Sequence, residues 1–296
     1  MVSRLGEILP PGALIEQAPM KEHTSFRIGG PADVLALPAT EEQIAGVIRF
    51  TRENDIPCHL IGNGSNLLVS DDGLRGVVVK IGKNFSQTRV DGNVITAQAG
   101  VLLSRVANLA AEHSLSGLEF ASGIPGTLGG AVVMNAGAYG GEMCQVVTST
   151  RFVNRNGEII ELHGDAHGFG YRKSVFGEGD VVLTSCLTLS EGERDDIYAK
   201  MSELNAARRE KQPLEFPSAG SAFKRPEGAF AAKLIDDAGL RGFSVGDAAV
   251  SEKHCGFIVN LGNASCEDVL RLMEQVKERV YAYSGIMLEP EVRYLG

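Results

Sequence analysis

The stretch GNGSNLLVSD, residues 62–71, decides the fold. It follows the apolar run Cys58 to Ile61 and leads directly into Leu67 to Val69, so it predicts a tight turn between two short strands. Glycines let the backbone amides of such a turn approach a ligand and bind phosphate oxygens. The turn is not a dinucleotide fingerprint of the Rossmann type, because Leu67 stands where the third glycine belongs and a strand follows where a helix belongs. Taken alone, the segment is also compatible with a plain glycine-rich hairpin.

A second glycine-rich segment, ASGIPGTLGGA at residues 121–131, leads into a short helix predicted over residues 129–134. Free amides and the positive dipole at the start of that helix would complement a pyrophosphate. Two such loops about sixty residues apart predict a clamp around a dinucleotide, with two purely structural turns as the alternative. If the clamp exists, bulky substitutions at Gly64 or Gly126 should weaken cofactor retention more than folding.

Outward from these loops, the pattern of apolar runs predicts an α+β protein. Between residues 33 and 98, short apolar runs alternate with turn signals and predict a small mixed sheet, and a helix capped by Thr40 covers it. A further helix and three strands complete this first unit. The predicted strands are 34–37, 58–61, 67–69, 77–81, 94–97, 146–154, 158–162 and 181–189, and the predicted helices span 44–51 and 102–110.

After Ser190 the sequence changes character, which places a domain boundary near residue 192. Apolar residues at helical spacing from Ile197 to Ala207 predict a long charged helix, and the proline-rich segment 213–226 predicts a loop. The rest predicts a compact α+β lobe with helices at 229–238 and 269–280 and strands at 257–259 and 291–295.

Composition excludes several classes of protein. A formal net charge of −9 without any long Lys/Arg run argues against nucleic acid as a partner. No stretch approaches the roughly 18 uncharged apolar residues of a membrane span, and the start lacks the apolar region of a secretion signal, so neither membrane insertion nor secretion is expected. The five cysteines are odd in number and contain no C-x-x-C pair, which favours reduced thiols and a cytoplasmic location.

The motifs GNGSNLLVSD (62–71), SGIPGTLGGA (122–131) and NAGAYG (135–140) resemble those of the UDP-N-acetylenolpyruvoylglucosamine reductase (MurB) family of bacterial cell-wall synthesis. The resemblance runs in register from HTSFRIGG at residues 23–30 to LEPEVR at residues 288–293. It implies an N-terminal segment (1–22), a two-subdomain FAD-binding module of the vanillyl-alcohol-oxidase or PCMH type (23–192) and a smaller α+β substrate-binding domain (193–296). Longer members insert a segment for which the interval from Cys186 to Ser221 leaves no room, so the chain resembles the short form.

The activity implied by the resemblance is reduction of an enolpyruvyl C=C bond in UDP-N-acetylglucosamine enolpyruvate. NADPH would be the co-substrate, and hydride would pass through non-covalently bound FAD. In YRKSVF (171–176), Arg172 matches the residue that stabilises the enolate, since its guanidinium can hold a carboxylate through two parallel N–H bonds. In SAGSAFKRP (218–226), Ser221 matches the proton donor, and in EPEVR (289–293) Glu291 matches a carboxyl that in protonated form would donate a hydrogen bond to the enolate. Each residue singly could be structural, and only the joint match favours catalysis.

The resemblance also implies binding residues. Lys211 matches a lysine that contacts the substrate's diphosphate, and nearby cations suit a substrate that carries diphosphate and carboxylate, although Arg208 and Arg209 could simply solvate a helix end. The expected substrate contacts are Tyr171, Lys211, Lys224 and Arg225. The expected cofactor contacts are Arg27, Gly62, Asn63, Gly64, Ser65, Asn66, Leu67, Ser122, Gly123, Ile124, Pro125, Gly126, Thr127, Gly129, Gly130, Ala131, Asn135, Gly137, Ala138 and Tyr139.

No metal site is predicted. His163 and His167 have i, i+4 spacing, but neighbouring glycines argue against the helix that would align their rings, and H-E-x-x-H is absent. His254 and Cys255 are interpreted as structural. A monomer is expected. Two other functions remain open at this stage: an FAD oxidase of the same module acting on an alcohol or sugar, and a nucleotide-binding protein without turnover.

Overall fold

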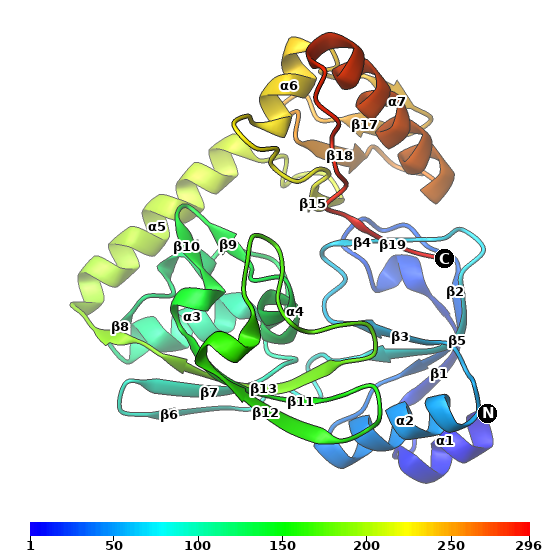
Figure 1. Cartoon of the computed structure of the whole chain (residues 1–296), viewed down its shortest axis with the longest axis vertical. Helices are drawn as coiled ribbons and strands as arrows, with labels where there is room; N and C mark the ends of the chain where they lie inside the picture. Colours follow the sequence, from blue (N-terminus) through cyan, green and yellow to red (C-terminus); the bar gives the residue numbers. More distant parts are fainter. The chain divides into compact units, whose positions relative to one another are not determined.

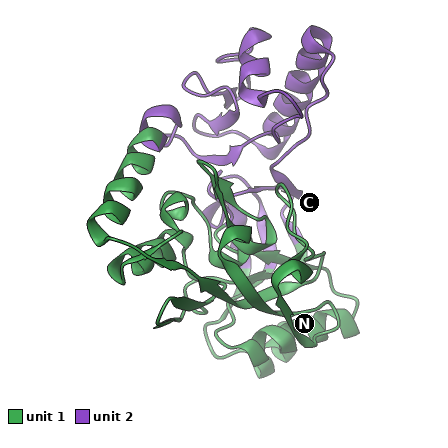
Figure 2. Cartoon of the chain, turned by 60° about the vertical axis from the view of Figure 1, so that its left-hand side comes forward, with its two compact units in different colours: residues 1–16, 34–63, 75–207 green, residues 17–33, 64–74, 208–296 purple.

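Helices and strands are mixed along the whole chain in the computed structural model, which describes residues 1–296 (Figure 1). The α+β class predicted from the sequence is confirmed. The chain divides into two units, each built from three segments (Figure 2). Unit 1 contains residues 1–16, 34–63 and 75–207, and unit 2 contains residues 17–33, 64–74 and 208–296. The predicted boundary near residue 192 separates a cofactor-binding part from a substrate-binding part. That assignment of binding roles stays a prediction.

The first sheet lies mainly in unit 1 and has the strand order β1-β2-β5-β3. Its parallel pair β3/β5 aligns Cys58 with Val77. Helix α2 begins after Thr40, whose hydroxyl accepts a hydrogen bond from the Gln43 amide at 3.2 Å, as the predicted cap requires. The elements are β1 (Leu14–Pro19), β2 (Pro31–Ala36), β3 (Cys58–Ile61), β5 (Leu74–Lys80), α1 (Val2–Ile8) and α2 (Glu41–Glu53).

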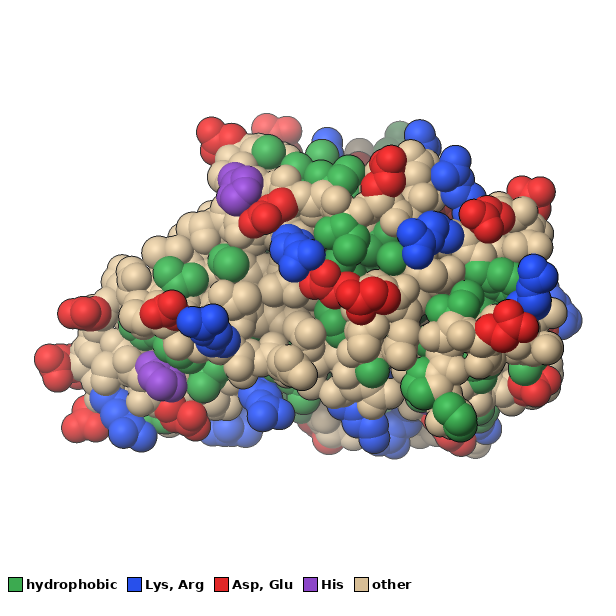
Figure 3. Space-filling model, turned by 90° about the horizontal axis from the view of Figure 1, so that it is seen from below, with side chains coloured by type: hydrophobic (Ala, Val, Ile, Leu, Met, Phe, Trp, Pro, Cys, Tyr) green, Lys and Arg blue, Asp and Glu red, His purple; other side chains and the backbone are tan.

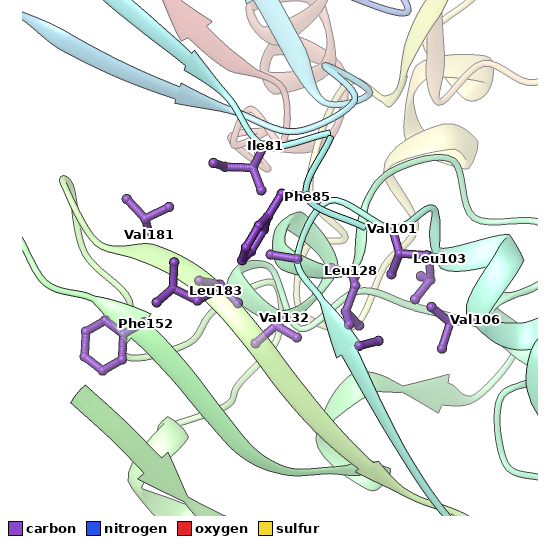
Figure 4. Packing of buried hydrophobic residues seen from close by; sticks show 14 of the residues in the cluster. Ile81, Phe85, Val101, Leu103, Val106, Leu128, Val132, Phe152, Val181 and Leu183 are labelled. Carbon is purple, nitrogen blue, oxygen red and sulfur yellow. The ribbon is translucent and has the colours of Figure 1, made fainter. Parts of the chain in front are cut away.

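A five-stranded antiparallel sheet with the order β12-β11-β13-β7-β6 forms the second part of unit 1. Figure 4 shows Leu128 and Val132 of α4 in one apolar cluster with Phe85 and with Leu183 of β13. All four side chains are fully buried, so packing on this sheet fixes the helix that follows the second glycine loop. The elements are β6 (Thr88–Asp91), β7 (Val94–Gln98), β11 (Val147–Val153), β12 (Ile159–His163), β13 (Val181–Thr188), α3 (Leu103–Glu112) and α4 (Leu128–Val133).

Two short antiparallel strand pairs complete unit 1, of which only β9/β10 is a hairpin. Strand β8 (Leu115–Ser116) pairs with β14 (Ser190–Glu191), and β9 (Gly137–Ala138) pairs with β10 (Gly141–Glu142). The second pair carries the NAGAYG motif.

Unit 2 has a four-stranded antiparallel sheet, order β15-β18-β17-β16, with an apolar core of its own. Helix α7 contributes Val269, Leu272, Val276 and Val280 to that core, which is the stripe predicted from the sequence. The elements are α5 (Arg194–Lys211), which runs from unit 1 into unit 2, β15 (Ser218–Ser221), α6 (Ala231–Asp237), β16 (Ser244–Val245), β17 (Ala248–Val250), β18 (Phe257–Asn260) and α7 (Cys266–Ser284).

The prediction of one small mixed sheet over residues 33–98 is wrong. Only the strands at 31–36, 58–61 and 74–80 share a sheet. Strand β4 (Leu67–Val69) pairs in parallel with the C-terminal strand β19 (Arg293–Leu295), and β7 joins the five-stranded sheet. Strand partners lie far apart in the sequence, so local patterns locate strands without assigning them to sheets.

Candidate functional site

The two glycine loops touch each other in unit 1. The first follows β3, which ends at Ile61, and the second ends at Thr127, the residue before α4. A side chain added at Gly62 would place its Cβ 2.3 Å from the Thr127 hydroxyl oxygen, so Gly62 is needed for this approach. The structure therefore brings together the two loops that were expected to clamp a dinucleotide.

Protein packing explains some of the predicted cofactor glycines. Gly64 has φ +66°, and a Cβ there would lie 2.2 Å from the carbonyl oxygen of His23. A Cβ at Gly129 would lie 2.7 Å from the Ala99 Cβ, where α4 approaches the chain after β7. Bulky residues at Gly64 would thus damage the fold itself, contrary to the expectation that cofactor retention would suffer more than folding.

Gly130 differs from these glycines. It is exposed, and a Cβ there would meet nothing nearer than the Thr127 hydroxyl at 3.8 Å. Glycine inside a helix costs about 1 kcal/mol relative to alanine. No packing within the protein requires glycine at this position, so the helix backbone here is open to the close approach of a ligand.

The expectation of free amides at the start of α4 is wrong for its first two residues. The Leu128 amide donates to the Val101 carbonyl at 2.8 Å, and the Gly129 amide donates to the Ala99 carbonyl at 2.9 Å. The helix starts directly against the segment that follows β7, and the carbonyls of that segment satisfy these donors. A pyrophosphate could accept hydrogen bonds from the Leu128 and Gly129 amides only if these two bonds were broken.

Four predicted site residues other than glycine have a positive φ, a backbone conformation that is strained for such residues. Arg27, Asn135, Tyr139 and Arg172 have φ values of +57°, +42°, +53° and +53°. Only three other non-glycine residues, Gln17, Asp55 and Ser114, share this left-handed conformation. Such a conformation costs a non-glycine residue about 1–2 kcal/mol and recurs at functional sites, where the surrounding structure enforces it.

Arg172 occupies the tip of a tight turn. Gly170 and Lys173 exchange two backbone hydrogen bonds, of 2.9 and 3.1 Å, so Tyr171 and Arg172 are the two central residues. The Nη2 atom of Arg172 donates to the Gly137 carbonyl at 3.2 Å, and its guanidinium carbon lies 5.1 Å from the centre of the exposed Tyr171 ring. The turn thus presents an exposed aromatic ring beside a cation that can bind an anion.

Asn135 is buried and uses its side chain within the protein. Its Nδ2 donates to Glu142 Oε2 at 3.0 Å and to the Gly170 carbonyl at 3.1 Å, and its Oδ1 accepts from the Cys144 amide at 2.9 Å. The side chain therefore ties the NAGAYG hairpin to the turn that carries Arg172.

Ser221 and Glu291 lie on neighbouring segments of unit 2. The Glu291 amide donates to the carbonyl of Ala222 at 2.9 Å, and Phe223 pairs with Pro290. Asn66 of the first glycine loop joins the same segment, since its Nδ2 donates to the Glu291 carbonyl at 3.1 Å and its own carbonyl accepts from the Arg293 amide at 2.9 Å. Three residues predicted from separate motifs are thereby linked in one unit, which local sequence patterns could not show.

The predicted substrate cations are spread over unit 2. Lys211 is exposed at the end of α5, Lys224 pairs with Glu289 at 3.2 Å, and the Arg225 guanidinium lies 4.0 Å from the Phe230 ring centre. The sequence motifs gave no role to Lys253, whose Nζ donates to the Arg209 carbonyl at 2.8 Å and lies 3.6 Å from the Glu215 carboxylate. Its charge near the end of α5 is therefore paired within the protein.

The remaining predicted cofactor residues lie on the two loops and the elements that follow them, on the hairpin and, for Arg27, in the segment before β2. Arg27 lines an open pocket of about 460 Å³ together with Lys21, Glu22 and Thr24. The Ser122 hydroxyl donates to the Glu119 carbonyl at 2.9 Å and accepts from Asn205 at 3.1 Å. Asn63, Ser65 and Leu67 belong to the first loop, Gly123, Ile124, Pro125, Gly126 and Ala131 to the second loop and α4, and Gly137, Ala138 and Tyr139 to the β9–β10 hairpin.

Histidines and thiols outside these motifs have structural surroundings. Burial lowers the pKa of His254, whose Nδ1 accepts from the Gly256 amide at 3.1 Å. Burial raises the pKa of the Cys255 thiol to about 11, so this sulfur stays protonated at neutral pH. His163 is exposed and His167 is fully buried, in a strand and a short 3₁₀ turn respectively. No group of three or more His, Cys, Asp or Glu side chains is arranged to hold a metal ion.

The surface carries charges of both signs. On the face shown in Figure 3, acidic and basic side chains are interspersed. None of the helices is both long enough and apolar enough to cross a bilayer.

Two family models match the chain. One describes an FAD binding domain and matches residues 32–163, and the other describes the C-terminal domain of UDP-N-acetylenolpyruvoylglucosamine reductase and matches residues 212–295.

Curated relatives match along the whole chain. The UDP-N-acetylenolpyruvoylglucosamine reductase of Caldanaerobacter subterraneus subsp. tengcongensis is 51% identical over 100% of this chain and 98% of its own. That of Clostridioides difficile is 52% identical over 94% of this chain and 92% of its own.

Among solved structures, UDP-N-acetylenolpyruvylglucosamine reductase (MurB) from Thermus caldophilus matches with a TM-score of 0.83 and 37% identity, covering 96% of this chain and 98% of that one. An alkyldihydroxyacetonephosphate synthase matches with a TM-score of 0.50 and 17% identity over 64% of this chain and 40% of that one, which is a likeness of fold alone. Together with the FAD-binding domain match, these findings confirm the predicted fold class.

Proposed function

The chain belongs to the UDP-N-acetylenolpyruvoylglucosamine reductase family, and from this premise we propose that Arg172, Ser221 and Glu291 carry the reaction. The chain is an FAD-containing oxidoreductase of peptidoglycan precursor synthesis. It reduces UDP-N-acetylglucosamine enolpyruvate to UDP-N-acetylmuramate with NADPH.

The two touching glycine loops would hold FAD, with Gly130 allowing it to approach the backbone of α4. When bound, FAD would supply the hydride-transfer chemistry between NADPH and the enolpyruvyl double bond. The fit is supported by the space beside Gly130, where a Cβ would have only the Thr127 hydroxyl within 4 Å, and by the left-handed backbone at Arg27 and Tyr139. Asn135 would act indirectly, because its side chain is bonded within the protein.

Arg172 would stabilise the negative charge that develops on the substrate carboxylate side as hydride arrives. A guanidinium is permanently charged and binds a carboxylate in a planar, two-bond geometry. The turn fixes its backbone, and the bond to the Gly137 carbonyl restricts its side chain. An arginine held in advance of the reaction loses little free energy through reorganisation.

Ser221 would donate the proton that the substrate carbon takes up, and Glu291 would assist on the enolate side. The hydroxyl is a weak acid, which is sufficient for a strongly basic carbanionic carbon, and Ser221 would regain its proton from solvent. The observation that carries this assignment is the pairing of the segments that bear Ser221 and Glu291 through the Glu291 amide and the Ala222 carbonyl.

The substrate's anionic groups would bind Lys211, Lys224, Arg225 and Tyr171. A local excess of cations is needed, because the net charge of −9 opposes the approach of a substrate that carries diphosphate and carboxylate. We further propose a cytoplasmic location, since all five cysteines are free thiols, the state expected in a reducing compartment. The proposal that the chain acts as a monomer is separate and rests on no contact in the structure. Sedimentation equilibrium of the FAD-loaded protein measures its molar mass and so tests whether it is a monomer.

Ser221→Ala divides the catalytic cycle into two measurable halves. Reduction of FAD by NADPH requires no proton donor for carbon, so this half should keep its rate. Reoxidation by the enolpyruvyl substrate should slow by about 10²–10⁴-fold, the usual contribution of a general acid, and Ser221→Cys should recover part of the rate. Rapid-mixing absorbance of FAD, first with NADPH and then with substrate, measures both halves.

Ser218→Ala on the same strand is the matched control and should leave both rates unchanged. If the Ser221→Ala protein is reoxidised by substrate at the wild-type rate, Ser221 is not the donor.

A further inference from the structure

Two side-chain hydrogen bonds hold the turn that carries Arg172, one on each side. The sequence motifs assign this role to neither side chain. On one side, Asn135 Nδ2 donates to the carbonyl of Gly170, the residue that opens the turn, at 3.1 Å. On the other side, the Ser174 hydroxyl donates to the carbonyl of Val133 at 2.7 Å. Val133 is the last residue of α4, where helix carbonyls lack a partner within the helix.

These two bonds oppose the strain at Arg172. Its φ of +53° is a left-handed conformation that is unfavourable for a non-glycine residue, since position i+2 of such a turn normally holds glycine. The two side-chain bonds act together with the two backbone bonds of the turn to offset this strain. Loss of either side-chain bond favours relaxation of the turn to an unstrained backbone.

Both bonds also connect Arg172 to segments that carry predicted cofactor residues. Ser174 attaches the turn to the helix that bears Gly129, Gly130 and Ala131, and Asn135 begins the NAGAYG segment. Asn135 is in turn fixed by Glu142 and by the Cys144 amide. The Arg172 backbone is thus positioned relative to the cofactor-binding helix by side-chain bonds as well as by the chain itself.

We propose that Ser174 and Asn135 are positioning residues that hold Arg172 in its strained, reactive geometry. This inference rests on the proposed role of Arg172 in the second half-reaction. Neither residue touches the reacting atoms in this proposal. Both act by keeping the guanidinium where the substrate's developing charge requires it.

Ser174 is the better residue to vary, because it is half-buried and its replacement by alanine removes only a hydroxyl, whereas Asn135 is buried and bonded three times. Ser174→Ala should slow reoxidation of FAD by the enolpyruvyl substrate about tenfold, as expected for the loss of one well-formed hydrogen bond. FAD content and the rate of FAD reduction by NADPH should stay at wild-type values. Ser174→Thr, which keeps the hydroxyl, should restore most of the rate.

The decisive measurement is a double-mutant cycle on the FAD-loaded protein. If Ser174 acts through Arg172, Ser174→Ala should cost little or nothing further once Arg172 has been replaced by alanine. Ser284→Ala is the control, because the Ser284 hydroxyl also donates to a helix carbonyl, that of Val280 at 2.8 Å within α7, and in addition accepts from the Ile286 amide at 3.2 Å. This control should leave both half-reactions unchanged in either background.

Equal slowing by Ser174→Ala in the wild-type and Arg172→Ala backgrounds overturns the inference and leaves the role of Arg172 intact. Reoxidation of FAD in the Ser174→Ala protein at the wild-type rate also overturns the inference and leaves the role of Arg172 intact. If FAD in the Arg172→Ala protein is reoxidised at the wild-type rate, Arg172 does not take part in the reaction, and the positioning role of Ser174 and Asn135 is refuted as well.

Discussion

Gly130 offers the most direct test of cofactor binding at the scale of one residue. Gly130→Ala should raise the free energy of unfolding of the apo-protein by about 0.5–1 kcal/mol, because alanine favours the helix and its Cβ meets open space. The same methyl group should weaken FAD binding if the cofactor approaches this backbone. Urea unfolding of the apo-protein and fluorescence titration with FAD measure the two effects.

Gly129→Ala is the control for Gly130→Ala. Its Cβ would lie 2.7 Å from the Ala99 Cβ, so it should destabilise the fold. A gain in stability from Gly130→Ala and a loss from Gly129→Ala would show that protein packing requires glycine at position 129 but not at position 130. An FAD dissociation constant unchanged by Gly130→Ala contradicts contact at this position.

The β9–β10 hairpin allows a test at the scale of one element. Its central residues, Tyr139 and Gly140, have φ values of +53° and +85°, as a type I′ turn requires. Asn-Gly is the preferred pair for this turn, whereas the tyrosine here is strained and 48% exposed. Tyr139→Asn should therefore raise the free energy of unfolding by up to about 1 kcal/mol while it lowers FAD affinity or turnover.

Thermal melts of the apo-protein, together with FAD titration and NADPH oxidation, measure the outcome for Tyr139→Asn. Gly140→Ala, which forces a methyl group onto a residue at φ +85°, should instead destabilise the hairpin. A Tyr139→Asn protein with wild-type affinity and turnover would remove this tyrosine from the site.

At the scale of the whole molecule, the net charge of −9 makes substrate binding depend on where the cations lie. Lys211→Ala should raise KM for the enolpyruvyl substrate, and the increase should shrink in high salt, because screening shortens the range of the attraction to about 3 Å at 1 M. Steady-state NADPH oxidation at low and high ionic strength measures this dependence.

Lys200→Ala is the control for Lys211→Ala, because it removes the same charge from the same helix at a residue that is paired with Glu203 at 2.9 Å. It should change KM little at any salt concentration. Equal effects of the two replacements would mean that Lys211 acts through net charge alone.

Much of the local structure follows from the sequence. The bounds of strands 58–61 and 67–69 follow from the sequence to the residue, since short apolar runs flanked by turn-forming residues define such elements locally. The cap at Thr40, the apolar stripe of α7 and the two glycine turns follow in the same way, because each depends on residues within a few positions of one another. The family motifs add the cofactor and the reaction, which local physics does not specify.

The tertiary structure alone decided the rest, namely which segments meet. The sequence could not show that β4 pairs with β19, that Val101 and Ala99 occupy the first amides of α4, or that Ser174 holds the end of that helix. The same is true of the bond from Asn66 to Glu291, which joins residues 225 positions apart. Local preferences act over one or two turns of chain, whereas these contacts form only when packing of whole elements offsets the entropy of closing long loops.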